Sequence, residues 1–157
     1  MYYTRFETDL CEVILIGDES GLKRIHLVAE DSNRDLLIED DWILNDDFFK
    51  KSILQLKEYF EGKRKTFDIK LCPEGTDFQK RVWEALKNID YGKTVSYKDI
   101  AIEIGNEKAS RAVGLANGKN PLPIVIPCHR VVGSNGKLTG YAFGMTLKEK
   151  IIQLEKH

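Results

Sequence analysis

Cys128 is the residue of this sequence best suited to form a covalent bond, because a thiolate is a strong nucleophile. It follows the apolar residues 124–126 and Pro127, and it precedes His129 and Arg130. A thiol needs a nearby base or positive charge to ionise near neutral pH, and these two neighbours can supply both. Adjacent residues do not automatically face each other, so His129 could act through a water molecule. The pair alone also fits a buried, inert cysteine beside a surface histidine.

The remaining cysteines and histidines point to no other chemistry. The three cysteines, Cys11, Cys72 and Cys128, are odd in number and widely spaced, which favours a reducing compartment, the cytoplasm, over a disulfide framework. No two of them have CxxC spacing and the three histidines are scattered, so we expect no metal site. No apolar run reaches the length of about 18 residues that a membrane span needs, and the charged first ten residues argue against a secretory signal.

Charge is divided unevenly along the chain. Residues 1–72 hold 11 Lys and Arg against 16 Asp and Glu, a net charge of −5, and residues 73–157 hold 13 against 9, a net charge of +4. A basic second half is a mild indication of a polyanionic partner, although surface composition alone could produce it.

The first half of the chain has a β-then-α pattern. Residues 11–17 and 22–28 are predicted to form a hairpin around the turn 18–21, and residues 31–47 to form a loop. Apolar residues from 48 to 60 recur at helical spacing up to Gly62. Residues 67–71 suggest a final strand, and residues 72–75, which contain Pro73 and Gly75, suggest a linker.

The second half is predicted to be mostly helical. One helix starts near Thr76, and a second starts after Ser96, which can cap it with Asp99 three residues on. A third short helix is expected from about residue 108 to 116, so that the last two form a helix-turn-helix pattern. Residues 133–136 predict a tight turn, and Thr146 to Glu149 have the pattern of a capping box that opens the last helix.

A longer string surrounds the cysteine and has counterparts along the second half. It reads NPLPIVIPCHRVVG from Asn120 to Gly133; the counterparts are TDFQ at 76–79, VW at 82–83, YG at 91–92, VSY at 95–97, ASRAVG at 109–114 and LTGY at 138–141. This set resembles the active-site signature of the O6-alkylguanine-DNA alkyltransferases, also called methylated-DNA–protein-cysteine methyltransferases. The similarity covers nearly all of residues 73–157, whereas residues 1–72 agree only in length and in element order.

The resemblance implies a two-domain α/β fold. Residues 1–72 would form a ribonuclease-H-like domain of β-sheet plus helix, and residues 73–157 a mostly helical winged-helix or helix-turn-helix domain. It also implies direct-reversal DNA repair, in which an alkyl group moves from O6 of guanine, with O4 of thymine left open, to Cys128 once per molecule. Double-stranded DNA would be the partner, no cofactor would be needed, and we expect a monomer. The target atom lies inside stacked duplex DNA, so the base must be flipped out.

The resemblance also assigns roles in the proton transfers. Glu155 would orient His129, which would take the thiol proton through a water molecule, in the logic of a nucleophile, base and orienter triad. Glu149 is a rival carboxylate, but the expected capping box already explains it. Asn120 would brace the active-site turn, and Tyr97 would guide the base and donate to guanine N3.

The DNA contacts follow from the same resemblance. Arg111, on the second helix of the helix-turn-helix, would enter the stack and fill the space of the flipped base, with that helix in the minor groove. Ala112 and Gly114 would allow close approach to DNA, and Ser96 and Tyr97 would lie beside it.

The expected substrate pocket contains one departure from the family pattern. Backbone groups of Cys128 and Val131 would read the guanine edge, and Tyr141 would line the pocket. Many family members continue with Ser-Gly-Gly or Ala-Gly-Gly, whereas this chain has Ala142 and Phe143 before a glycine. We expect the bulky Phe143 to narrow the pocket, so that methyl is accepted and benzyl is disfavoured.

Three other readings of the motifs remain open. A Cys-His hydrolase would need an oxyanion hole and would turn over many times. A DNA-binding module without chemistry would resemble the alkyltransferase-like proteins, which lack the cysteine that is present here as Cys128. A plain winged-helix regulator would leave residues 127–130 unexplained.

Overall fold

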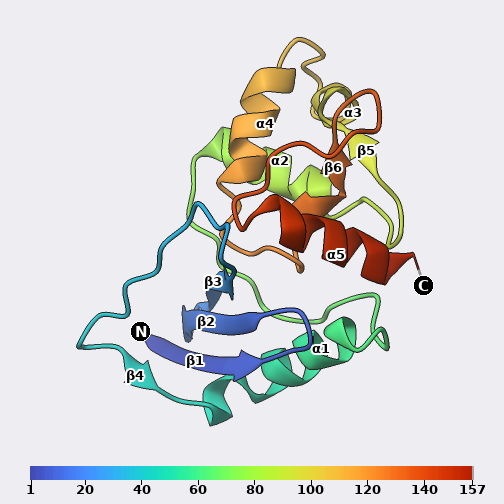
Figure 1. The fold of residues 1–157 in the computed structure, drawn as a ribbon. Coiled ribbons are helices and arrows are strands. Elements are labelled where there is room, and N and C mark those ends of the chain that lie inside the picture. Colours follow the sequence, from blue (N-terminus) through green and yellow to red (C-terminus); the bar gives the residue numbers. More distant parts are fainter. Residues whose placement is uncertain (157) are drawn as a thin grey trace.

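The N-terminal part of the chain is built on a four-stranded sheet. In the computed structural model, which describes residues 1–156, the strands are β1 (Tyr2–Glu7), β2 (Glu12–Asp18), β3 (Gly21–Val28) and β4 (Ile43–Leu44). Their order is β3-β2-β1-β4, antiparallel except for the β1–β4 pair (Figure 1). The predicted β2–β3 hairpin is confirmed, whereas the sequence pattern did not reveal β1 and β4.

One helix covers a face of this sheet. A short 3-10 helix, η1 (Asp47–Phe49), leads into α1 (Lys50–Phe60), which lies along β1 and β2 (Figure 1). The buried side of α1 carries Leu56, Tyr59 and Phe60, which belong to the same apolar core as Val13 and Leu15 of β2. Residues 13–17 of β2 are all buried, so both faces of this central strand are covered.

The strand expected at residues 67–71 is wrong. Only Leu71 forms a bridge, with Leu22 at the start of β3. Two backbone hydrogen bonds of 2.8 Å, from Leu22 N to Lys70 O and from Cys72 N to Leu22 O, hold the chain there. The segment forms one bridge and no full strand, because it only crosses the end of β3 on its way from the sheet to the helices.

The second part starts with capped helices. Thr76 and Gln79 form a capping box before α2 (Asp77–Leu86). The predicted capping box of Ser96 and Asp99 is confirmed, and it opens α3 (Tyr97–Glu103) directly after the short strand β5 (Val95–Ser96). Both caps follow from local sequence because the side chains and the orphan N–H groups lie within one turn of each other.

A helix pair and the cysteine segment complete the centre of this part. α4 (Ser110–Gly118) packs on α2 and α3, and the indole N–H of Trp83 donates to Ala116 O at 2.9 Å. The chain then forms the 3-10 helix η2 (Cys128–Arg130) and the strand β6 (Val131–Val132), which pairs in parallel with β5. α3 and α4 therefore form the expected helix-turn-helix beside the cysteine.

The start of the last helix corrects an expectation. α5 (Met145–Glu155) begins after Gly144 and has no side-chain cap of its own, so Thr146 and Glu149 form no capping box. Instead, the carboxylate of Asp31, from the loop after β3, accepts a hydrogen bond from Thr146 N at 3.3 Å. An anion from the other part of the chain thus takes over one orphan donor of the first turn. None of the helices within residues 1–156 has the length and apolar character to cross a membrane.

Candidate active site

Cys128 is held by a tightly braced turn. The Asn120 side chain, fully buried, donates to Ile126 O at 2.8 Å and accepts from Leu122 N at 3.0 Å. Between them Ile124 adopts a φ of 75°, a left-handed conformation that is strained for a β-branched residue. A side-chain amide that bonds the backbone on both sides can stabilise such a turn, which delivers Cys128 into η2.

His129 and Glu155 form a buried pair next to the cysteine. His129 Nε2 lies 2.7 Å from Glu155 Oε2, and both residues are buried. Glu155 also accepts from Arg130 Nε and Nη2, each at 2.9 Å, from Gly92 N at 3.3 Å and from the hydroxyl of Tyr59. The rival carboxylate, Glu149, is exposed on the surface. Glu155 is therefore the carboxylate that contacts His129.

The charge states of this pair follow from its surroundings. Burial alone would raise the pKa of Glu155, but the hydrogen bonds from His129, Arg130 and Tyr59 outweigh it and hold the pKa well below its usual range. Burial lowers the pKa of His129, against the opposing effect of Glu155. An ionised Glu155 can only accept, so His129 carries its proton on Nε2 and its Nδ1 is a free lone pair. Nδ1 has no hydrogen-bond partner among the described residues, as suits a general base.

The thiol itself is protonated at rest. Cys128 is only 3% exposed. Burial raises its pKa, while Asn120, Arg34 and Tyr141 act in the opposite direction. A buried thiol of this kind needs a base at the moment of reaction, and His129 is placed in the adjoining position.

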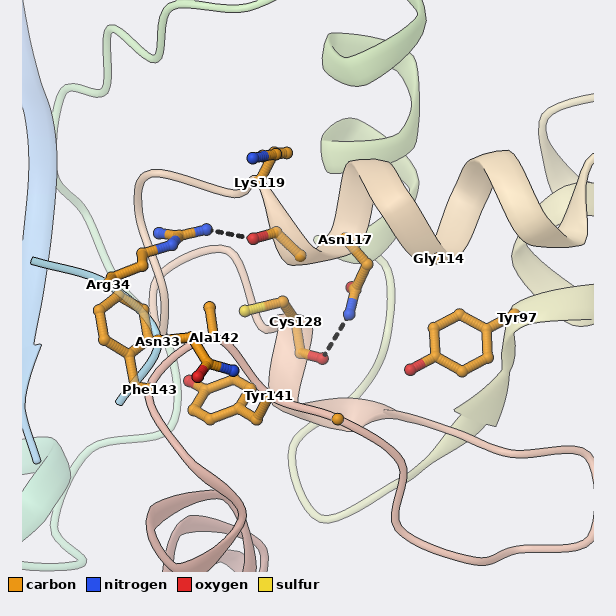
Figure 2. A pocket seen from close by; sticks show the side chains of 12 residues that line it. Asn33, Arg34, Tyr97, Gly114, Asn117, Lys119, Cys128, Tyr141, Ala142 and Phe143 are labelled. Carbon is orange, nitrogen blue, oxygen red and sulfur yellow. Dashed lines mark hydrogen bonds between the residues drawn. The ribbon is translucent and has the colours of Figure 1, made fainter. Parts of the chain in front are cut away.

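The cysteine opens on a cavity of about 450 Å³. Its walls come from α4, the loop at 140–143 and the loop after β3, and Figure 2 shows Cys128 between Arg34 on one side and Tyr97 on the other. The residues that line it are Asn33, Arg34, Tyr97, Gly114, Asn117, Gly118, Lys119, Cys128, Gly140, Tyr141, Ala142 and Phe143. A planar ring system of nucleobase size would fit such a space.

Of the predicted pocket residues, Tyr141, Ala142 and Phe143 line this cavity, whereas Val131 is fully buried and is not among the lining residues. Tyr141 and Phe143 are buried, and Ala142 is half-buried. Phe143 packs edge-on against His26, with ring centroids 5.7 Å apart, and against Tyr141, at 5.8 Å. Its ring is thus fixed between the two parts of the chain.

The predicted DNA-contact residues lie on the helix-turn-helix. Arg111 and Ala112 are exposed near the start of α4, and Gly114 faces the Tyr97 ring, which a Cβ at Gly114 would meet at 3.7 Å. The Tyr97 hydroxyl forms a 2.6 Å hydrogen bond with that of Thr139. Ser96 is half-buried and serves as the cap of α3.

Two site residues come from positions that the sequence pattern did not indicate. Arg34, in the acidic loop after β3, donates to Asn120 O at 2.7 Å and to Gly118 O, and its guanidinium lies 4.9 Å from the centroid of Phe143. No local pattern marks Arg34, because its partners are more than 80 residues away. Neighbouring Asn33 donates its N–H to Ala142 O at 2.8 Å.

Lys148 is the second such residue. It is fully buried on α5 and donates to Val131 O at 2.8 Å and Thr139 O at 3.3 Å. Burial lowers its pKa to about 8. A signal for it existed, since Lys148, Ile151 and Glu155 share one helical face at spacings of three and four. The Val131 carbonyl retains its second lone pair for another donor.

The described residues offer no metal centre of the usual kind. Nowhere in residues 1–156 do three or more His, Cys, Asp or Glu side chains gather as ligands would.

The site consists of a cysteine, a histidine and a carboxylate at the base of a cavity beside a helix-turn-helix. This arrangement defines a class of protein that combines a DNA-binding element with a buried nucleophile.

Comparison with known proteins identifies the family. Residues 1–73 match the family described as "6-O-methylguanine DNA methyltransferase, ribonuclease-like domain", and residues 77–157 match "6-O-methylguanine DNA methyltransferase, DNA binding domain". The chain belongs to the 6-O-methylguanine DNA methyltransferase family. The predicted fold class and the resemblance seen in the sequence are thereby confirmed.

Individual relatives agree over the whole length. The chain is 52% identical over 155 residues to the methylated-DNA–protein-cysteine methyltransferase of Methanosarcina acetivorans, covering 99% of this chain and 98% of the relative. It is 44% identical over 164 residues to the constitutive enzyme of that name from Bacillus subtilis, covering 99% and 95%. A crystal structure of Mycobacterium tuberculosis OGT in complex with DNA matches with a TM-score of 0.90 at 42% identity, covering 99% and 93%.

Proposed function

We propose that this protein repairs DNA by moving an alkyl group from O6 of guanine in double-stranded DNA to Cys128, irreversibly and once per molecule. The observation that carries the proposal is the position of Cys128, buried at the base of a cavity beside α4 and next to the His129–Glu155 pair. The names of the full-length relatives describe methyl transfer from methylated DNA to a protein cysteine.

The proposed reaction is a displacement at the alkyl carbon. His129 Nδ1 takes the thiol proton through a water molecule, and Glu155 stabilises the imidazolium that results. The Cys128 sulfur then bonds to the alkyl carbon while the bond from that carbon to O6 breaks, and O6 keeps the electron pair. A proton delivered to the guanine ring, with Tyr97 as the donor to N3, restores the neutral base. The product is a thioether without a good leaving group, so turnover stops at one.

The helix-turn-helix would present the lesion to this site. We assign DNA contact to Ser96, Tyr97, Arg111, Ala112 and Gly114, with α4 in the minor groove. The exposure of Arg111 and Ala112 near the start of α4 supports this role. Arg111 would occupy the stack when the guanine is flipped out, a step that costs a few kcal/mol.

The cavity would hold the flipped base. The carbonyls of Cys128 and Val131 would accept from its edge, and Tyr141, Ala142 and Phe143 would surround the alkyl group. The fixed ring of Phe143 supports selectivity for methyl over benzyl.

We also propose that the chain consists of two domains, an N-terminal α/β domain of residues 1–72 and a C-terminal DNA-binding and alkyl-acceptor domain of residues 73–157. The segment that leads to α2 makes its last backbone hydrogen bond to β3 at Cys72, and α2 itself begins at Asp77. The free thiols of Cys11 and Cys72 support a reducing compartment, the cytoplasm, and we expect the protein to act as a monomer.

The test is the stoichiometry of transfer. The protein is mixed with an excess of duplex DNA that carries one radiolabelled O6-methylguanine, and label on the protein is followed beside the variant Cys128→Ser. One label per protein, with none on the variant, supports the proposal. Continued release of product would support a Cys-His hydrolase, and tight binding without label would support a non-catalytic lesion binder.

A further inference from the structure

Glu155 receives a hydrogen bond from the other part of the chain. Tyr59, on α1 against the N-terminal sheet, donates its hydroxyl to Glu155 Oε2. The same oxygen lies 2.7 Å from His129 Nε2 and accepts from Arg130 Nη2 at 2.9 Å. The hydroxyl and the imidazole therefore compete for one carboxylate oxygen.

The Tyr59 ring is fixed in this position. Its side chain is 0% exposed, and it packs edge-on against Phe60 and Tyr91, with ring centroids 5.4 and 6.2 Å away, and in a tilted arrangement against Phe67 at 5.6 Å. Burial and the neighbouring Glu155 raise the pKa of Tyr59 far above its ordinary value, so the phenol is a permanent neutral donor. The hydrogen bond from this neutral hydroxyl to the ionised carboxylate is charge-assisted, and such bonds are stronger than those between two neutral groups.

We propose that Tyr59 is a positioning residue for the transfer reaction, and that its hydroxyl weakens the attraction of Glu155 for protonated His129. The inference rests on the proposed function, because it assigns His129 as the base that serves Cys128. It gives the N-terminal part of the chain a share in the reaction, through α1, beyond the support of the fold.

The direction of the effect follows from electrostatics. A donor at Oε2 spreads the negative charge of Glu155 and weakens its attraction for a protonated His129. Without the hydroxyl, the carboxylate attracts the imidazolium more strongly, so His129 keeps its proton to higher pH. A base that is protonated cannot accept the thiol proton, so the rate of transfer at a given acidic pH would fall.

Other charged groups around the pair stay in place when only this hydroxyl is removed. Arg130 and Lys148 both disfavour protonation of His129, Glu155 favours it, and the ammonium of Lys65 lies 5.4 Å from the Tyr91 ring centroid. The uncharged thiol of Cys128 and phenol of Tyr141 lie on the cavity side. Each of these groups is present in both variants described next.

Tyr59→Phe removes the hydroxyl and keeps the ring, and Tyr91→Phe is the matched control. Tyr91 packs on Tyr59, but the hydroxyl that donates to Glu155 is that of Tyr59. The single-turnover rate with O6-methylguanine duplex is measured from acidic to neutral pH for the three proteins. In parallel, the protonation of His129 is followed by NMR of its imidazole nitrogens, and thermal unfolding records any loss of stability.

The expected result is an upward shift of the His129 midpoint, and of the acidic limb of the rate, by about one pH unit in Tyr59→Phe, equivalent to roughly tenfold in the protonation equilibrium. Tyr91→Phe should coincide with the unchanged protein. Identical midpoints in all three proteins, or equal shifts in both variants, would overturn the inference even if Tyr59→Phe is less stable. Failure of the unchanged protein to transfer any methyl group would instead reject the proposed function, and the NMR midpoints would still decide the effect of Tyr59 on His129.

Discussion

The guanidinium of Arg34 donates a 2.7 Å hydrogen bond to the backbone carbonyl of Asn120, the residue whose side chain braces the turn before Cys128. Arg34 also donates to Gly118 O at the end of α4, and it lies over the Phe143 ring. One side chain from the loop after β3 therefore touches the turn, the helix-turn-helix and the pocket wall. The two parts of the chain meet at the nucleophile.

Arg34→Lys should slow transfer by about tenfold, roughly 1.4 kcal/mol in the activation barrier. A lysine keeps the charge but lacks the planar fork that reaches two carbonyls and stacks on an aromatic ring. The measurement is the single-turnover rate, with Arg24→Lys as the control. Arg24, on β3, donates at 3.0 Å to the carbonyl of Asp35, which lies beside Arg34 in the same loop. Equal rates for both variants and the unchanged protein would show that Arg34 has no part in aligning the site.

Stability should decrease as the pH falls. The pKa values of His129 and Glu155 are both lower in the folded protein than in the unfolded chain. The unfolded chain therefore binds protons first, so the free energy of unfolding falls below about pH 6.5 for His129 and below about pH 4.3 for Glu155. Urea denaturation from about pH 8 down to about pH 2 checks this, and Glu155→Gln should show a shallower decline below about pH 4.3. A free energy of unfolding that stays constant over this range would show that folding does not lower the pKa values of His129 and Glu155.

Arg111→Ala should affect duplex and single-stranded substrates differently. Because the proposed role of Arg111 is to fill the stack left by the flipped base, its loss matters only where a stack exists. We expect transfer from duplex DNA to slow by about tenfold or more, as flipping costs a few kcal/mol, and transfer from a short single strand to change little. Lys80→Ala, an exposed position on α2 that does not line the cavity, is the control. A similar loss on both substrates would indicate a role in general DNA affinity.

Phe143→Ala should relax the selectivity of the pocket. The unchanged protein is expected to react slowly with free O6-benzylguanine, because the Phe143 ring is held by His26 and Tyr141. The variant should raise the benzyl-to-methyl ratio of rates, although removing a buried Phe costs about 3–5 kcal/mol of stability. The ratio is informative because loss of folded protein affects both rates equally. Fast reaction of the unchanged protein with the benzyl compound would contradict this view of the pocket.

Local signals in the sequence predicted the parts of the fold that local contacts determine. The Ser96 cap, the β2–β3 hairpin and the helix-turn-helix are short-range features, and the structure has all three. The strand β1 has little apolar alternation and lies in the sheet because β2 pairs with it along its whole length. The expected cap of α5 was wrong because Asp31, from a distant loop, supplies the acceptor.

The same distinction holds for the site. His129 and Glu155 could be predicted because a motif spacing resembled that of a known family, and the structure brings the two together. Arg34 and Tyr59 could not, because each reaches its partner across more than 80 residues of chain. Contacts of that range are determined by the packing of the two parts, and no window of sequence contains them.

The most direct test of the account is the mass of the protein after reaction. The protein is incubated with duplex DNA that carries one O6-methylguanine, and the intact mass is followed by peptide mapping. We predict that one methyl group replaces the thiol hydrogen on the peptide containing Cys128, and that further DNA adds no second group. An unchanged Cys128 peptide, or methylation at Cys11 or Cys72 instead, would contradict the account.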